Sequence, residues 1–126
     1  MRLLGGEHPY TLTARNNLAR LLAVREQWAE SETIFRDVLE IRLRTLGDAH
    51  PDTQVSRATF ARALMSMDRH EEAEGYALDA RVRFIAALGA DHPYTQLTQR
   101  TLVEIYEHLD RPDEAAKYTI ESTDGR

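Results

Sequence analysis

Three histidines recur at a fixed interval, and imidazole is a side chain that binds metal ions and transfers protons. His8, His50 and His92 each precede a proline, and neighbouring copies are 42 residues apart. Dedicated metal sites usually take their ligands from short spacings or from facing elements. We therefore interpret these residues as turn histidines near helix N-termini, and we expect no metal site and no cofactor.

The remaining histidines lie beside carboxylates, a combination that can act in acid–base catalysis. His70 is followed by Glu71 and Glu72, and His108 lies four residues after Glu104. However, acidic residues near a helix start complement the helix dipole, and a pair four residues apart is an ordinary helix contact. The sequence also has no glycine-rich phosphate loop, His-Glu-x-x-His pair or Gly-x-Ser-x-Gly turn. We therefore expect no enzymatic activity.

The composition excludes further classes of function. A net charge of −5 argues against general nucleic-acid binding, which needs a basic surface. The chain has no apolar run long enough to span a membrane and no signal peptide at its start. Because it has no cysteine, it has neither disulfides nor thiolate metal sites. We expect a cytoplasmic protein without nucleic-acid or membrane partners.

Glycine and proline around the three turn histidines mark the boundaries of helices. Each copy has the pattern Leu-Gly-x-x-His-Pro-x-Thr, at residues 4–11, 46–53 and 88–95. Glycine suits the left-handed position after a helix, and proline suits the first turn of the next helix. A period of this length indicates an array of stacked helical units.

Apolar residues recur at helical spacing twice within each unit, which predicts an all-α superhelix of three antiparallel helix hairpins. First helices are expected at about 9–25, 51–67 and 93–109, and second helices at about 28–46, 70–87 and from 112 onward. The array is a single domain over 1–126, with repeats at about 9–47, 51–89 and 93–121, the last hairpin being short. We expect 1–4 to end a preceding helix and 122–126 to fray.

Small residues at aligned positions predict close contact between the two helices of each hairpin. Those of the first helices are Ala19, Ala61 and Val103, and those of the second helices are Ser31, Ala73 and Ala115. The one tryptophan, Trp28, begins a second helix, where we expect it to anchor the packing.

The repeat resembles the tetratricopeptide repeat, in the 42-residue form found in kinesin light chains and in bacterial relatives. The residues that carry this resemblance are Asn16-Asn17-Leu18-Ala19-Arg20-Leu21-Leu22, Trp28-Ala29-Glu30-Ser31-Glu32 and Val38-Leu39-Glu40-Ile41-Arg42. The resemblance covers residues 3 to about 118. It implies a right-handed superhelix, here a bacterial fragment, whose first helices line a concave groove that binds a peptide or helix of a partner protein.

The resemblance also implies which residues line this groove. They are Thr13, Asn16, Asn17 and Arg20 in the first repeat, Val55, Ala58, Thr59 and Arg62 in the second, and Leu97, Arg100, Thr101 and Glu104 in the third. Independently of the resemblance, the short polar residues Asn17, Thr59 and Thr101 could pair with the main chain of an extended ligand. Of the 16 basic residues only Lys117 is a lysine, and arginines in the groove would favour an acidic partner.

Two alternatives stay open at the level of the sequence. The groove face could be an ordinary solvated helix surface that binds nothing. The chain could also be an assembly or spacer segment of a larger signalling or regulatory protein, associating as a homodimer through uncapped repeat ends.

Overall fold

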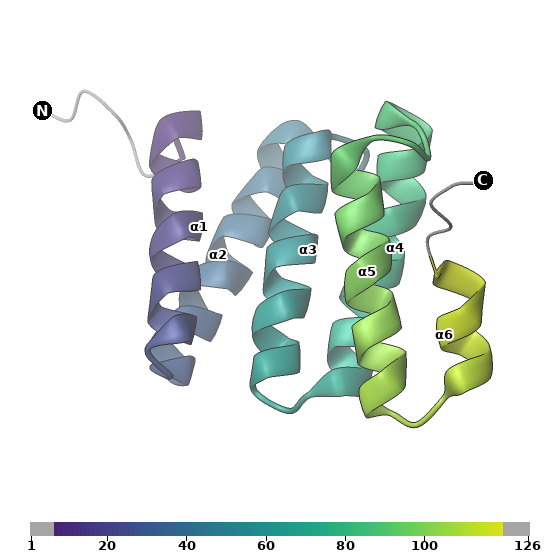
Figure 1. Ribbon diagram of the computed structural model, residues 1–126. Coiled ribbons are helices and arrows are strands. Elements are labelled where there is room, and N and C mark those ends of the chain that lie inside the picture. Colours follow the sequence, from purple (N-terminus) through teal and green to yellow (C-terminus); the bar gives the residue numbers. More distant parts are fainter. Residues whose placement is uncertain (1–6, 120–126) are drawn as a thin grey trace, which may run out of the picture.

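The computed structural model describes residues 7–119, which form six helices. Figure 1 shows them as three successive pairs. The helices are α1 (Pro9–Val24), α2 (Trp28–Leu46), α3 (Pro51–Ser66), α4 (His70–Leu88), α5 (Pro93–His108) and α6 (Pro112–Tyr118). The bounds of α1 to α5 and the start of α6 lie within one residue of those predicted from the sequence. The helix end expected at 1–4 and the tail expected at 122–126 lie outside the described residues.

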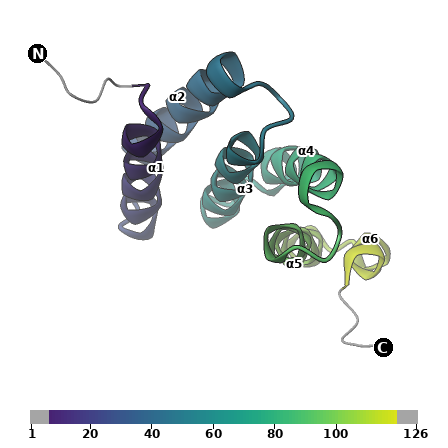
Figure 2. The same ribbon diagram turned by 90° about the horizontal axis from the view of Figure 1, so that it is seen from above.

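The helices are arranged along an arc, with α1, α3 and α5 on its inner side and α2, α4 and α6 on its outer side (Figure 2). The two helices of each pair pack together, and α2 packs on α3 and α4 on α5, which joins the pairs. The structure is therefore the expected all-α superhelix of three hairpins, with a short last hairpin.

The three turn histidines begin the inner helices. The Nδ1 atom of His8 accepts a hydrogen bond from the backbone N–H of Tyr10, at 3.2 Å. His50 and His92 accept the same bond from the residue two positions later, at 3.0 Å in both cases. Each bond satisfies a backbone donor that a helix start leaves unpaired. This confirms the interpretation of these residues as turn histidines.

The turns use positive φ angles at two places in the repeat. Gly47 and Gly89 end the outer helices at φ 93° and 96°, as their residue type predicts. Sequence reasoning missed Glu26, Asp68 and Asp110, which have φ angles of 61°, 66° and 59° in the turns within the hairpins. The backbone N–H after each of them bonds back to the carbonyl five residues earlier, at 2.8–2.9 Å. These bonds close the inner helices and fix the hairpin geometry.

The interior lies between the inner and outer helices. Ala19, Ala61 and Ala73 are fully buried, and the Ser31 hydroxyl donates to the Ala19 carbonyl at 2.8 Å. Small side chains therefore bring the paired helices close, as predicted. The aligned Val103 is only partly buried against this core.

Aromatic rings form the junction between the first two hairpins. Phe35 of α2 stacks on Phe60 of α3 with ring centroids 5.5 Å apart, and Phe60 contacts Tyr76 of α4 at 4.9 Å. Trp28 is partly buried against the same core. This junction packs the second hairpin against the first.

A network of ion pairs covers the junction on its outer side. Glu32 of α2 accepts hydrogen bonds from Arg69 and Arg36, both at 2.7 Å, and Arg36 also reaches Glu72 of α4 at 2.8 Å. The bond from Arg69, with a smaller contribution from Arg36, lowers the pKa of Glu32 to about 2. The carboxylate therefore stays ionised well into the acidic range.

Candidate functional site

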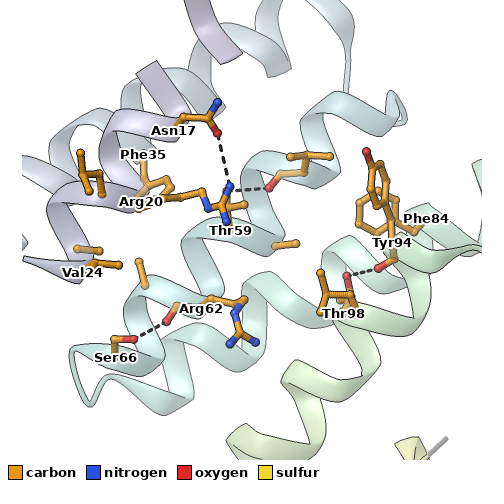
Figure 3. A pocket seen from close by; sticks show the side chains of 16 residues that line it. Asn17, Arg20, Val24, Phe35, Thr59, Arg62, Ser66, Phe84, Tyr94 and Thr98 are labelled. Carbon is orange, nitrogen blue, oxygen red and sulfur yellow. Dashed lines mark hydrogen bonds between the residues drawn. The ribbon is translucent and has the colours of Figure 1, made fainter. Parts of the chain in front are cut away.

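The concave side of the arc contains a cavity of about 760 Å³. Its size falls within the range of ~300–1,000 Å³ found for ligand sites. All three hairpins contribute to its lining (Figure 3). The lining residues are Asn17, Arg20, Leu21, Ala23, Val24, Phe35, Val55, Ala58, Thr59, Arg62, Ala63, Ser66, Phe84, Tyr94, Leu97 and Thr98.

Large apolar side chains of the cavity are open to solvent. Val24 is 79% exposed at the end of α1, and Leu21, Tyr94 and Leu97 are each about half exposed. They come from α1 and α5, the two inner helices that flank α3. Val55 of α3 is partly buried between them. Exposed apolar side chains that line a cavity are typical of an interaction site.

Among the described residues that line the cavity, Arg20 and Arg62 are the charged ones. Arg20 donates to Asn17 at 3.5 Å, which is at the long end for a hydrogen bond. Arg62 donates to Thr101 at 3.0 Å and forms an ion pair with Glu104 at 3.4 Å. Since Arg62 and Glu104 are both about half exposed, this pair is weak.

The serine and threonine hydroxyl groups that line the cavity donate to their own helices. Thr59 donates to the Val55 carbonyl at 2.8 Å, and Thr98 to the Tyr94 carbonyl at 2.8 Å. Ser66 donates in the same way to the carbonyl four residues earlier, at 3.2 Å. These hydroxyls can still accept hydrogen bonds, but each already donates its proton to a backbone carbonyl.

The structure brings together about half of the residues proposed from the sequence. Seven of them line the cavity: Asn17, Arg20, Val55, Ala58, Thr59, Arg62 and Leu97. Five do not belong to its lining: Thr13, Asn16, Arg100, Thr101 and Glu104.

Four of these five have partners within the protein, one of them being Glu104, which pairs with Arg62. Asn16 is 4% exposed and donates to Thr59 at 3.1 Å, across the contact between α1 and α3. Thr101 is 3% exposed and accepts from Arg62. Thr13 accepts from the buried Arg42 at 3.2 Å. The first two of these hydrogen bonds join neighbouring hairpins, and the third joins the two helices of the first hairpin.

Sequence reasoning missed several residues of the cavity. Val24 lies four residues after Arg20, so extending the same helix face by one turn would have found it. Phe35 and Phe84 belong to the outer helices α2 and α4 and reach the cavity between the inner ones. No pattern within the inner helices could have indicated these two residues.

Within residues 7–119, no group of three or more His, Asp or Glu side chains is placed to hold a metal ion. None of the six described helices combines the length and the apolar character needed to cross a membrane.

Comparison with known proteins identifies the repeat. A family model of the tetratricopeptide repeat matches residues 11–52 and 53–94, two consecutive 42-residue units that together make up about two thirds of the chain. No curated protein matches the chain.

Solved structures with kinesin-light-chain-like repeats are similar to this chain. One is a structure from Podosopora anserina described as a kinesin light chain with nearly identical TPR-like repeats. It is 26% identical with a TM-score of 0.73, covering 91% of this chain and 55% of its own. A variant of that protein is 26% identical with a TM-score of 0.75, at 93% and 55% coverage.

A third structure, BtubC (BKLC) from P. vanneervenii, shares the fold alone at 16% identity. Its TM-score is 0.83, over 90% of this chain and 45% of its own. This chain thus spans about half the length of the structures it matches. From the repeat model and the six-helix superhelix we conclude that the chain belongs to the tetratricopeptide repeat family, whose repeats generally mediate protein–protein interaction.

Proposed function

We propose that this chain binds a segment of a partner protein in the cavity on its concave side. The observation that carries the proposal is the cavity itself, about 760 Å³ in volume and lined from all three hairpins. TPR scaffolds are typically not enzymes, and we assign a binding role to the residues of the cavity. A cytoplasmic location stays a prediction from the sequence.

Physical chemistry favours occupation of this surface. Covering Val24, Leu21, Tyr94 and Leu97 would remove large apolar side chains from water, the main favourable term in protein association. Arg62 lies among them with a weak ion-pair partner, and arginine is enriched among the residues that dominate binding energy. The same arginine favours an acidic group on the partner.

A peptide display selection against the purified chain tests this proposal. Enriched peptides should bind the unaltered protein and lose most of their affinity for Leu97→Asp or Arg62→Glu. Val82→Asp is the matched control, because Val82 is an exposed valine of the outer helix α4. Peptides that bind all of these proteins equally would show that the cavity is not the binding site.

A second candidate function is self-association through the face of α1 that carries Leu18. Leu18 is 47% exposed, whereas Phe60 and Leu102, at the same position of the later repeats, are fully buried. In those repeats α2 packs on α3 and α4 on α5. We propose that a second copy of the chain covers Leu18 in a homodimer.

Analytical ultracentrifugation at increasing concentration tests the homodimer. A dimer that Leu18→Glu converts to a monomer would support it. A monomer over the whole concentration range would exclude it.

A further inference from the structure

We propose that the occupant of the cavity is an amphipathic α-helix, with an apolar stripe bordered by carboxylates, rather than an extended peptide. This inference rests on the proposed function, because it specifies the partner segment of the same cavity. Four features of the lining lead to it: the use of its hydroxyls, its few free donors, the distribution of its apolar side chains and its charge.

The hydroxyls of the inner helices are unsuited to pairing with an extended chain. Thr59, Thr98 and Ser66 each donate to the carbonyl four residues earlier in their own helix. Thr101, the third member of the predicted polar ladder, donates to the Leu97 carbonyl at 3.1 Å and is buried. Two of the three members of the expected ladder, Thr59 and Thr101, therefore already donate their hydroxyl protons within the protein, and only Asn17 can still donate to a ligand.

The side chains that can still donate into the cavity are few. They are the Asn17 amide, the Tyr94 hydroxyl and the guanidinium groups of Arg20 and Arg62. An extended segment buried in an apolar cavity would leave main-chain groups without partners, which is costly. A helix pairs its main-chain groups internally, so it brings no such requirement.

The open apolar side chains suit a helix face. They lie on three parallel inner helices, with Val24 and Leu21 on α1, Val55 on α3, and Tyr94 and Leu97 on α5. Figure 3 shows Val24 and Tyr94 at opposite sides of the cavity. A helix presents apolar residues over a stripe at least ~100° wide, so one helix can contact both sides while its polar face stays in water.

The charge of the lining specifies the border of that stripe. Arg20 and Arg62 are positively charged, and the described lining contains no acidic residue, although the whole chain carries a net charge of −5. Glu104, outside the lining, contacts Arg62 at 3.4 Å from a half-exposed position. A carboxylate of an incoming helix can therefore take the place of Glu104 beside Arg62 and approach Arg20 as well.

Two display libraries that differ at one fixed position provide the probes. In the first, peptides of about five helical turns are built on an alanine-rich helix, with positions i, i+3, i+4 and i+7 and the positions bordering them randomised. The second library carries the same positions but a fixed central proline, which breaks the helix. We expect enrichment from the first library, with leucine-like residues at i, i+3, i+4 and i+7 and glutamate at the bordering positions.

The best peptide is then synthesised in three forms, and its affinity is measured by fluorescence anisotropy. The second form has two central residues replaced by their D-enantiomers, and the third has glutamine in place of glutamate. Relative to the parent, we expect each change to weaken binding by about tenfold or more, as for an interface residue that matters. On Arg62→Gln, the change from glutamate to glutamine should have no further effect, which would show that the two groups interact directly.

The control is Arg83→Gln on the outer helix α4, which removes one positive charge away from the cavity. It should leave all three affinities unchanged. If only the proline library is enriched, or if the D-residue form binds as tightly as the parent, an extended ligand occupies the cavity. The proposed function then stands while this inference falls. If neither library yields a peptide that is sensitive to Leu97→Asp, both are overturned.

Discussion

The junction between the first two hairpins and the concave cavity share helix α3, yet they are built in opposite ways. At the junction, Phe60 is fully buried against aromatic rings of α2 and α4. In the cavity, Arg62, two residues later, is about half exposed and meets a weak partner. Thr59 lies beside Phe60 in the sequence and lines the cavity. The face of the helix, rather than the segment of sequence, decides whether a residue holds the fold or is open to a ligand.

This contrast makes stability and binding separable. Substitutions at the junction should change the free energy of unfolding, because closely packed interiors tolerate neither voids nor added volume. Substitutions in the cavity should change affinity for peptides and leave the free energy of unfolding nearly constant, since exposed side chains contribute little to it.

The largest effect is expected for Phe60→Ala. Removing the ring leaves a void between Phe35 and Tyr76, at a cost of about 3–5 kcal/mol in the free energy of unfolding. Urea denaturation followed by circular dichroism measures it. Phe60→Leu covers the case in which the alanine variant does not fold, and Val82→Ala on the exposed face of α4 is the control. Equal effects of Phe60→Leu and Val82→Ala would contradict the role of the junction.

A smaller loss is expected for Ala73→Leu, because Ala73 is fully buried where the helices of the second hairpin meet. The larger side chain should cost about 1–3 kcal/mol by overpacking. Ala86→Leu, at an exposed position of the same helix, makes the same chemical change without a packed neighbour. If Ala73→Leu lowers the melting temperature and Ala86→Leu does not, the helices of the second hairpin are in close contact at Ala73. Equal melting temperatures of the two variants would show that the close contact lies elsewhere.

The ion pairs over the junction should give a modest dependence on pH. Because the folded protein lowers the pKa of Glu32 from 4.5 to about 2, its contribution is present above pH 4.5 and is lost as the pH falls towards about 2. Arg36 and Arg69 are more than one third exposed. We therefore expect the ion pairs of Glu32 to contribute only about 1 kcal/mol to the free energy of unfolding. Glu32→Gln should lower the stability near neutral pH, and its difference from the unaltered protein should shrink on acidification. A difference independent of pH would exclude this origin.

The smallest effect on stability is expected for Arg62→Glu, although its effect on binding should be large. The free energy of unfolding should change by no more than ~0.5 kcal/mol, because the pair with Glu104 is exposed and weak. Affinity for a selected peptide should fall by about tenfold or more. Measuring the free energy of unfolding and the peptide affinity on one preparation tests whether stability and binding are separable. A loss of stability comparable to that of Ala73→Leu would mean that the cavity residues also hold the fold.

The helices could be predicted from the sequence almost to the residue because local chemistry sets their ends. Proline after each histidine starts the inner helices, and Gly47 and Gly89 end the outer ones. The left-handed residues Glu26, Asp68 and Asp110 were missed because neither Glu nor Asp requires a positive φ. There the backbone bonds of the hairpin turn impose the conformation.

The cavity could be predicted only in part. Helical spacing places Asn17, Arg20 and Thr59 on the inner face. The spacing does not indicate which side chains of the neighbouring helix they contact. Asn16 faces Thr59, and Thr101 faces Arg62. Whether such a polar side chain is offered to a ligand depends on contacts between repeats, which the pattern within one helix does not contain.

The sequence by itself determined the repeat, the helix boundaries and the face of each inner helix, because these follow from the spacing of residues along one chain. Tertiary structure alone decided which polar side chains were bonded to a neighbouring helix, which arginines had partners, and that Phe35 and Phe84 of the outer helices complete the cavity. The physical reason is that hydrogen bonding and burial belong to pairs of surfaces, and residues 42 positions apart meet only when the superhelix has formed.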